Sequence, residues 1–314
     1  MAEHAGTLGA AWRGLRKQGA SLFLVHIAWT ALGLILVAPL VGAFGQLLLH
    51  LSGESAVADQ DIARFALTPL GLGSILLIAS ISVAVVALEI ASMMRVLVGR
   101  THDRPVTTLG AIRFASTRAP RIVTLALNVL VRALLIALPF LAAAGGLAWF
   151  LLTDHDINYY LSERPPAFWV AAVVIGALLF VLVVLLVRKL VGWSLALPLQ
   201  LFAGAGSRQA LTESEGITQG KRWRVFVALA GWALAALLFS ALLLGLVHTL
   251  GGWLLPESPR SLGGTVVILG FLALLFTAGN LLVTGFNAAL FSLVDLDLFE
   301  RHGPGVSAEL LGAA

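Results

Sequence analysis

The sequence has no cysteine, which excludes disulfide bonds and cysteine-ligated metal sites. Charge is also scarce: only 11% of the residues are Asp, Glu, Lys or Arg, against about 25% in an ordinary soluble domain. Such a chain has too few charged side chains to cover the surface of a water-soluble globule. It also lacks a phosphate-binding P-loop, a Gly-x-Ser-x-Gly nucleophile turn and a His-Glu-x-x-His zinc helix. These motif classes of enzyme are therefore not indicated.

Apolar residues make up 59% of the sequence and gather in long runs. A helix needs about 20 apolar residues to cross the hydrocarbon core of a bilayer, and six runs are long enough. They cover residues 21–49, 70–98, 122–152, 167–192, 225–250 and 265–293. The runs lack the alternation of an outer-membrane barrel strand, and lipid-exposed backbone must satisfy its own hydrogen bonds. The predicted fold class is an all-α, polytopic integral membrane protein with six transmembrane helices.

The basic residues predict the orientation of this protein. Most of the 20 Lys and Arg residues lie in the termini or in the loops on the same side as the termini. Only Arg64, Arg164 and Arg260 lie in the opposite loops. By the positive-inside rule, both termini are predicted to be cytoplasmic, in a bacterial inner membrane. The sequence pI of about 10.1 then reflects contact with anionic headgroups, and nucleic acid is not predicted as a partner.

A weak repeat divides the chain into three similar units. Leu-Gly-Ala occurs at residues 8–10 and 109–111 before a basic stretch and a predicted span, and a third unit begins near Ser207. Each unit reads as a surface helix, a span, an outer loop and a returning span, so we predict three repeated hairpins. Residues 1–20 are predicted to form an amphipathic interfacial helix. The membrane domain then covers residues 21–299, and residues 300–314 form a short cytoplasmic tail.

Two opposite charges are predicted to lie deep in the membrane. Glu89 lies eleven residues before Arg100, and Arg132 lies eleven residues after Arg121. Each is therefore about 16 Å along its helix from its predicted cytoplasmic boundary, at 1.5 Å per residue. Because an isolated charge is costly there, we expect them to contact each other, with Asn128 one turn from Arg132. Two interpretations stay open: a clamp that fixes helix packing, or a site for a substrate or headgroup. His26 and His248, near the ends of spans, are assigned no role.

The most polar stretch is HDINYYLSERPPAFW, residues 155–169, in the loop after the third predicted span. Asp156 is a good N-cap for a short helix over residues 157–163, and the two prolines that follow suit the start of span four. Three interpretations stay open: a folded loop that caps the bundle, a headgroup lid, or a weak cation site. The lid would use Tyr159, Tyr160 and Arg164, and the cation site would use Asp154, His155, Asp156 and Glu163. The two-His spacing of a zinc site is missing, and neither a metal nor a cofactor is predicted.

This stretch, the basic segments before the spans and the string RWRVF before span five resemble one known family. They are similar to the membrane domain at the amino terminus of bacterial glycerophosphoryl diester phosphodiesterases. The resemblance covers nearly the whole chain and implies a six-helix membrane domain, followed in longer relatives by another span and a catalytic barrel. Such a barrel needs about 250 residues, and its His-Arg-Gly signature does not occur here. No catalytic residue is carried over to this sequence.

We therefore expect a non-catalytic membrane module that holds or presents a phospholipid-derived substrate, or that scaffolds an envelope partner such as a phosphodiesterase. Membrane phospholipids are the expected small-molecule partners. A transporter or channel for glycerophosphodiesters or lipids, with its site around Glu89, Asn128 and Arg132, is the alternative. An intramembrane enzyme using Glu89 as acid or base is a weaker third interpretation, because no second carboxylate is expected at its depth.

Overall fold

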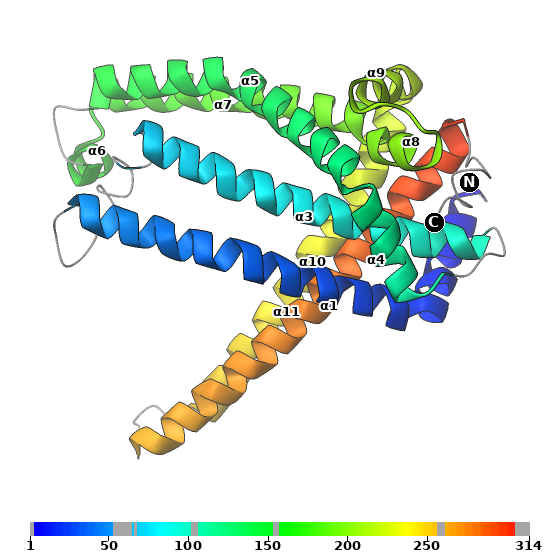
Figure 1. Cartoon of the computed structure of the whole chain (residues 1–314). Helices are drawn as coiled ribbons and strands as arrows, with labels where there is room; N and C mark the ends of the chain where they lie inside the picture. The colour runs from blue at the N-terminus through cyan, green and yellow to red at the C-terminus, as the bar shows by residue number, and fades with distance from the viewer. Residues whose placement is uncertain are drawn as a thin grey trace.

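A computed structural model shows the arrangement of the helices (Figure 1). It describes residues 3–52, 65, 68–101, 106–152, 157–255 and 261–304. Within these ranges the secondary structure consists of helices and the short turns between them, with no strand. The all-α fold class predicted from the sequence is confirmed.

Six of the described helices are long and apolar enough to cross a bilayer. The long helices are α1 (Glu3–Ser52), α3 (Pro69–Thr101), α5 (Ala119–Leu152), α7 (Pro166–Trp193), α10 (Arg222–Leu254) and α11 (Leu262–His302). The short ones are α4 (Thr108–Thr117), α6 (Ile157–Glu163), α8 (Ala196–Phe202) and α9 (Ser207–Thr218). All six predicted spans fall within these long helices. Among the C-terminal ends of the spans, that of α11 differs most, since this helix continues to His302 instead of ending near residue 293.

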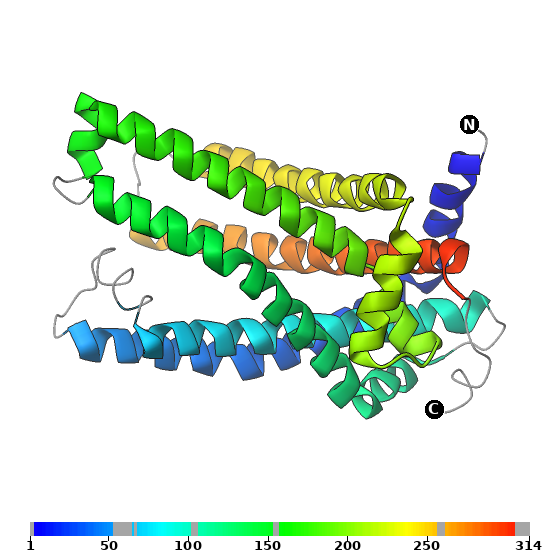
Figure 2. The same ribbon diagram turned by 90° about the horizontal axis from the view of Figure 1, so that it is seen from above.

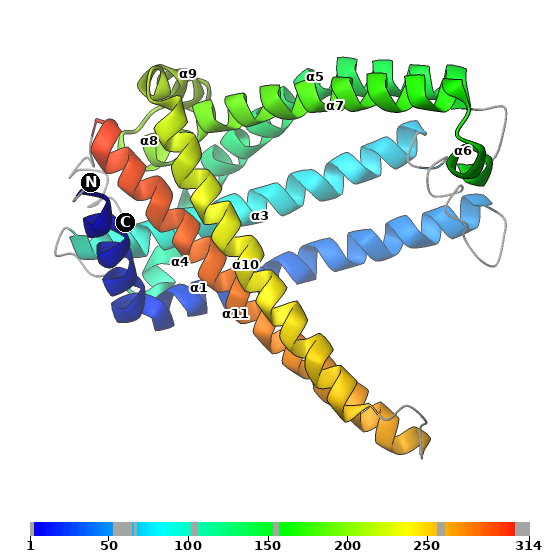
Figure 3. The ribbon, with the colours of Figure 1, turned by 180° about the vertical axis from the view of Figure 1, so that it is seen from behind.

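The long helices pack as consecutive pairs: α1 with α3, α5 with α7, and α10 with α11. Figures 1 and 3 show that the pairs meet at the end of the molecule that holds α4, α8 and α9, and diverge toward the end that holds α6. We call these the termini end and the loop end, because α1 begins and α11 ends at the first of them. Figure 2 shows the first turns of α1 bending away from the rest of that helix. The interfacial position of those turns and the equivalence of the three units stay predictions.

The core of the protein lies at the termini end. Phe114, Phe202 and Phe299 are almost fully buried there, and they come from α4, α8 and α11. The ring of Phe202 lies between the other two, with centroid distances of 6.4 Å and 6.5 Å. Toward the loop end, by contrast, large apolar side chains such as Trp149 and Phe180 are exposed. Such side chains suit contact with lipid, and this supports the membrane-spanning assignment.

The break between α7 and α8 explains why the polar helix α9 packs there. The ends of helices leave backbone groups without partners, and these must be satisfied where water is excluded. The buried Ser214 hydroxyl of α9 donates to the Gly192 carbonyl at 2.7 Å and accepts from the Leu195 amide at 3.1 Å. Gln200 of α8 donates to the Arg121 carbonyl at 3.1 Å, at the start of α5. Two polar side chains thus hold the middle hairpin to the core.

Candidate functional site

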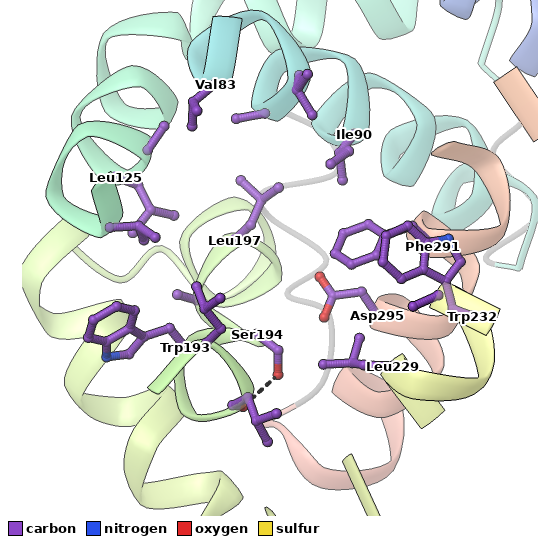
Figure 4. Close-up of a pocket in the computed structure, with 18 of the residues that line it drawn as sticks. Val83, Ile90, Leu125, Trp193, Ser194, Leu197, Leu229, Trp232, Phe291 and Asp295 are labelled. Atoms are coloured by element: carbon purple, nitrogen blue, oxygen red, sulfur yellow. Dashed lines mark hydrogen bonds between the residues drawn. The ribbon is translucent and has the colours of Figure 1, made fainter. Parts of the chain in front are cut away.

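A pocket of about 590 Å³ lies where the helix pairs meet. Its walls come from α3, α5, α7, α8, α10 and α11, represented in Figure 4 by Val83, Ile90, Leu125, Leu197 and Phe291. We call it the junction pocket. Its lining is apolar except for Trp193, Ser194, Trp232 and Asp295. A cavity of this kind suits the chain of an amphiphile better than a water-soluble metabolite.

Asp295 is the one carboxylate in the pocket lining. Its side chain projects from α11 into the pocket, beside Phe291 and Trp232 (Figure 4). The residue is only 1% exposed, and its Oδ1 atom has no hydrogen-bond partner among the described residues. Buried polar groups in native proteins nearly always have a partner. The carboxylate oxygen without a partner therefore makes Asp295 a candidate for ligand binding.

The other polar side chains of the pocket are already engaged. The Ser194 hydroxyl donates to the Val191 carbonyl at 3.0 Å (Figure 4). The Trp232 indole donates to the Asn287 carbonyl at 3.0 Å, and the Trp193 indole donates to Glu215 at 2.6 Å. Each of these groups has one N–H or O–H to give. The pocket lining thus supplies no free side-chain donor to Asp295.

Glu215 of α9 holds one wall of the pocket in place. Its Oε1 atom accepts from Trp193 and from Lys189, the latter at 3.0 Å, so it ties α9 to the last turns of α7. Burial raises the pKa of the Glu215 carboxyl, but the hydrogen bonds from Lys189 and Trp193 and the charge of Lys189 outweigh burial and leave the pKa below its ordinary value. The ionised form is therefore the one that the folded protein stabilises.

This shift predicts how stability depends on pH. Because folding lowers the pKa of Glu215, its ionisation stabilises the protein above the ordinary value of 4.5, and this contribution is lost as pH falls through the lower folded-state pKa. Glu215→Gln should melt below the wild type near neutral pH, and the gap should close in acid. The difference in melting temperature between the two proteins is measured from roughly pH 7 to pH 3, which covers the range of carboxyl titration. A gap that is independent of pH would contradict the assignment.

A second buried polar cluster joins α1, α3 and α11. The His26 Nδ1 atom lies 2.7 Å from Glu89 Oε1, and its Nε2 atom lies 3.1 Å from the Thr284 hydroxyl. His26 and Glu89 are 5% and 7% exposed. On the same two helices, the Trp29 indole donates to Ser92 Oγ at 2.9 Å. These bonds lock α1 to α3 and attach α11, the helix that carries Asp295.

The contact predicted between Glu89 and Arg132 is wrong, because Glu89 pairs with His26 instead. Arg132 and Asn128 do share α5, as expected, but Asn128 donates its side-chain amide to the Thr124 carbonyl one turn back, at 2.8 Å. Helix α5 turns Val129, rather than these two residues, toward the junction pocket. The three residues thus do not form the single cluster expected from their depth.

The described part of the polar stretch at residues 155–169 includes α6, which lies at the loop end (Figure 1). The predicted helix over residues 157–163 is present as α6, and span four begins at Pro166 as expected. Tyr160 is buried, its hydroxyl lies 3.5 Å from the Leu151 carbonyl, and its ring packs edge-on against Tyr159. Glu163 and Arg164 are exposed. Asp156 lies outside the described residues, as do Asp154 and His155, so the cation site is not tested.

The sequence analysis did not identify three residues of these sites: Asp295, His26 and Glu215. Asp295 was placed beyond span six, although it falls one helical turn after Phe291 and so continues the apolar face of that span. His26 lies about 14 Å along the helix from Lys17, a depth close to that of Glu89. A comparison of all ionisable residues by depth would have found this pair. No sequence pattern connects Glu215 with Trp193, because they meet only when α9 packs on α7.

Comparison with known protein families gives one match. The family described as "Membrane domain of glycerophosphoryl diester phosphodiesterase" matches residues 10–298. Comparisons with curated proteins and with solved structures gave no match. The matched region contains the junction pocket and the His26 cluster in full.

Proposed function

Since the chain belongs to the family of membrane domains of glycerophosphoryl diester phosphodiesterases, we propose that it binds a phospholipid or a phospholipid-derived amphiphile inside the membrane. In this proposal the molecule sits in the junction pocket and is presented to a phosphodiesterase or another envelope partner. The chain itself acts as a non-catalytic module. The matched family describes the membrane domain and not the catalytic one.

The observation that carries the proposal is the junction pocket itself. Its volume of about 590 Å³ and its apolar walls match the chain of an amphiphile, whose burial contributes about 0.8 kcal/mol per methylene group in transfer from water. A deacylated glycerophosphodiester has no such chain and would leave this lining unused. The pocket therefore favours a ligand that still carries an acyl chain.

Basic residues near the pocket support a ligand with a phosphate. Arg121 directly precedes the lining residue Ile122, and Arg188 directly follows Val187. Arg222 comes one turn before Phe226 on α10 and has a buried Nε atom without a hydrogen-bond partner among the described residues. Arginine binds phosphate oxygens through paired hydrogen bonds. The lipid headgroup would then face the termini end, which the positive-inside rule assigns to the cytoplasm.

Transport is the alternative, and the structure favours it less. The expected transport site required Glu89, Asn128 and Arg132 to act together. Glu89 is engaged by His26, and Asn128 by its own helix. A binding module needs only the pocket.

Filling the junction pocket tests the proposal. Ala126 and Ala230 line it from α5 and α10, so Ala126→Phe and Ala230→Phe should exclude the ligand. Native mass spectrometry of wild type and both variants, released from nanodiscs of defined phospholipids, measures retained lipid. We expect the retained lipid to fall at least tenfold in the variants, corresponding to about 1.4 kcal/mol or more.

Ala143→Phe is the matched control, because Ala143 is exposed on the same helix as Ala126. It makes the same chemical change outside the pocket and should leave lipid retention unchanged. Melting temperatures establish that the variants are folded. Equal lipid retention by folded pocket-filled variants and the wild type would overturn the proposal.

A further inference from the structure

The Asp295 carboxylate needs a partner that the described protein groups do not supply. It is 1% exposed, its Oδ1 atom is unpartnered, and its side chain points into the junction pocket (Figure 4). The side-chain donors of the pocket lining already make other hydrogen bonds, because Trp193, Ser194 and Trp232 each donate to a group other than Asp295. Further along α11, Arg301 pairs with Asp297 at 2.9 Å and not with Asp295. Among the described residues, the pocket itself is the open space from which a donor can reach this oxygen.

The chemistry of a buried carboxylate restricts that occupant. An ionised carboxylate only accepts hydrogen bonds, and burying its charge without a partner is costly. A ligand with a positive charge and N–H groups both compensates the buried negative charge and donates a hydrogen bond to it. Such charge-assisted hydrogen bonds are about twice as strong as neutral ones. A quaternary ammonium has the charge but no N–H. Comparing a ligand that has a primary ammonium with one that has a quaternary ammonium therefore separates the effect of hydrogen bonding from that of charge.

We propose that the junction pocket selects an amphiphile whose headgroup carries a primary ammonium, and that Asp295 accepts a hydrogen bond from it. This rests on the proposed function and names the class of ligand for the same pocket. The apolar walls of the pocket contact the acyl chain of the ligand, and Asp295 binds its headgroup. Among membrane phospholipids, the ethanolamine headgroup has this chemistry.

The position of Asp295 suits a headgroup. At 1.5 Å per residue it lies about 10 Å from the end of α11 at His302. Ala233, which also lines the pocket, lies about 16 Å from the start of α10 at Arg222. The pocket therefore extends from near the termini end into the depth of the hydrocarbon core. An amphiphile can place its ammonium at Asp295 and its chain deeper along the walls.

The test compares two phospholipids with identical acyl chains and the same net charge. Wild-type protein is incorporated into nanodiscs containing phosphatidylethanolamine and phosphatidylcholine in equal amounts, and the lipids retained on release are counted by native mass spectrometry. We expect a preference of about tenfold for the ethanolamine lipid, which is about 1.4 kcal/mol. In Asp295→Asn, which keeps the shape but loses the charge, the ratio should fall to about one.

Asp297→Asn is the matched control, since Asp297 is half-exposed on the same helix and pairs with Arg301. It should keep the wild-type preference. Asp295→Leu is a second variant, which should also retain lipid without discrimination, and melting curves establish that each protein is folded. Retention without a headgroup preference in the wild type, or an unchanged preference in folded Asp295→Asn, would overturn the inference. Neither outcome contradicts the proposed function. That function is contradicted if the folded variants Ala126→Phe and Ala230→Phe retain as much lipid as the wild type.

Discussion

Replacing Glu89 with alanine is expected to destabilise the protein by about 3 kcal/mol, a typical loss when one partner of a buried pair is removed. The change leaves the His26 Nδ1 atom buried without the acceptor that now lies 2.7 Å away. It also loosens a junction of three helices, because the same imidazole contacts Thr284 of α11. Thermal unfolding in detergent, followed by tryptophan fluorescence, measures the loss.

A double-mutant cycle identifies the interaction behind this loss. His26→Ala should be destabilising as well, and the double variant should lose less than the sum of the single variants, by about 0.5 to 3 kcal/mol. Glu163→Ala, a change of the same type at an exposed position of α6, should stay within about 0.5 kcal/mol of the wild type. Strictly additive effects of the His26 and Glu89 substitutions would show that the two side chains do not interact. The cycle thus separates a specific pair from two independent losses.

The second large effect is expected at Gly285, where α11 packs against His26 of α1. A Cβ atom built on Gly285 would lie 2.8 Å from Cδ2 and 3.1 Å from Cγ of His26. The imidazole cannot simply move away, since Glu89 and Thr284 hold both of its nitrogens. Gly285→Ala should therefore destabilise the protein by about 1 to 3 kcal/mol, the usual range for overpacking. Unfolding curves in the same detergent provide the measurement.

Two further variants show whether His26 causes this cost. Gly285→Ala should be nearly neutral in a His26→Ala background, because the clashing ring is gone. Gly279→Ala is the matched control on the same helix: its Cβ would meet the end of Leu243, a flexible side chain that can change rotamer. If Gly285→Ala is as mild as Gly279→Ala, or as harmful without His26 as with it, the close approach seen in the structure does not limit stability.

The helices could be predicted from the sequence because each span is a local property. An apolar run long enough to cross the bilayer can satisfy its backbone only as a helix, whatever its neighbours are. The short helix at residues 157–163 was also predictable, since the proline pair gives a local stop and a new start. The end of α11 was not, because Asp295 and Asp297 look like the start of a polar tail. In the structure one of these carboxylates is buried and the other is half-exposed.

The candidate site could be predicted only in part. Depth along a helix, counted from the basic boundaries, correctly marked Glu89 as a buried charge. It did not identify the partner, because depth leaves the rotation of each helix about its axis undetermined. A pairing across helices depends on that rotation and on which helices are neighbours. This is why Arg132 was chosen over His26.

The sequence by itself determined that this protein is a helical membrane protein, where its spans lie and to which family it belongs. Composition, run length and short motifs are readable along one chain. Only the tertiary structure decided that His26 pairs with Glu89, that Gly285 makes room for them, and that Asp295 faces an apolar pocket. These features are contacts between helices far apart in the sequence, so they exist only once the helices have packed with a particular rotation and set of neighbours.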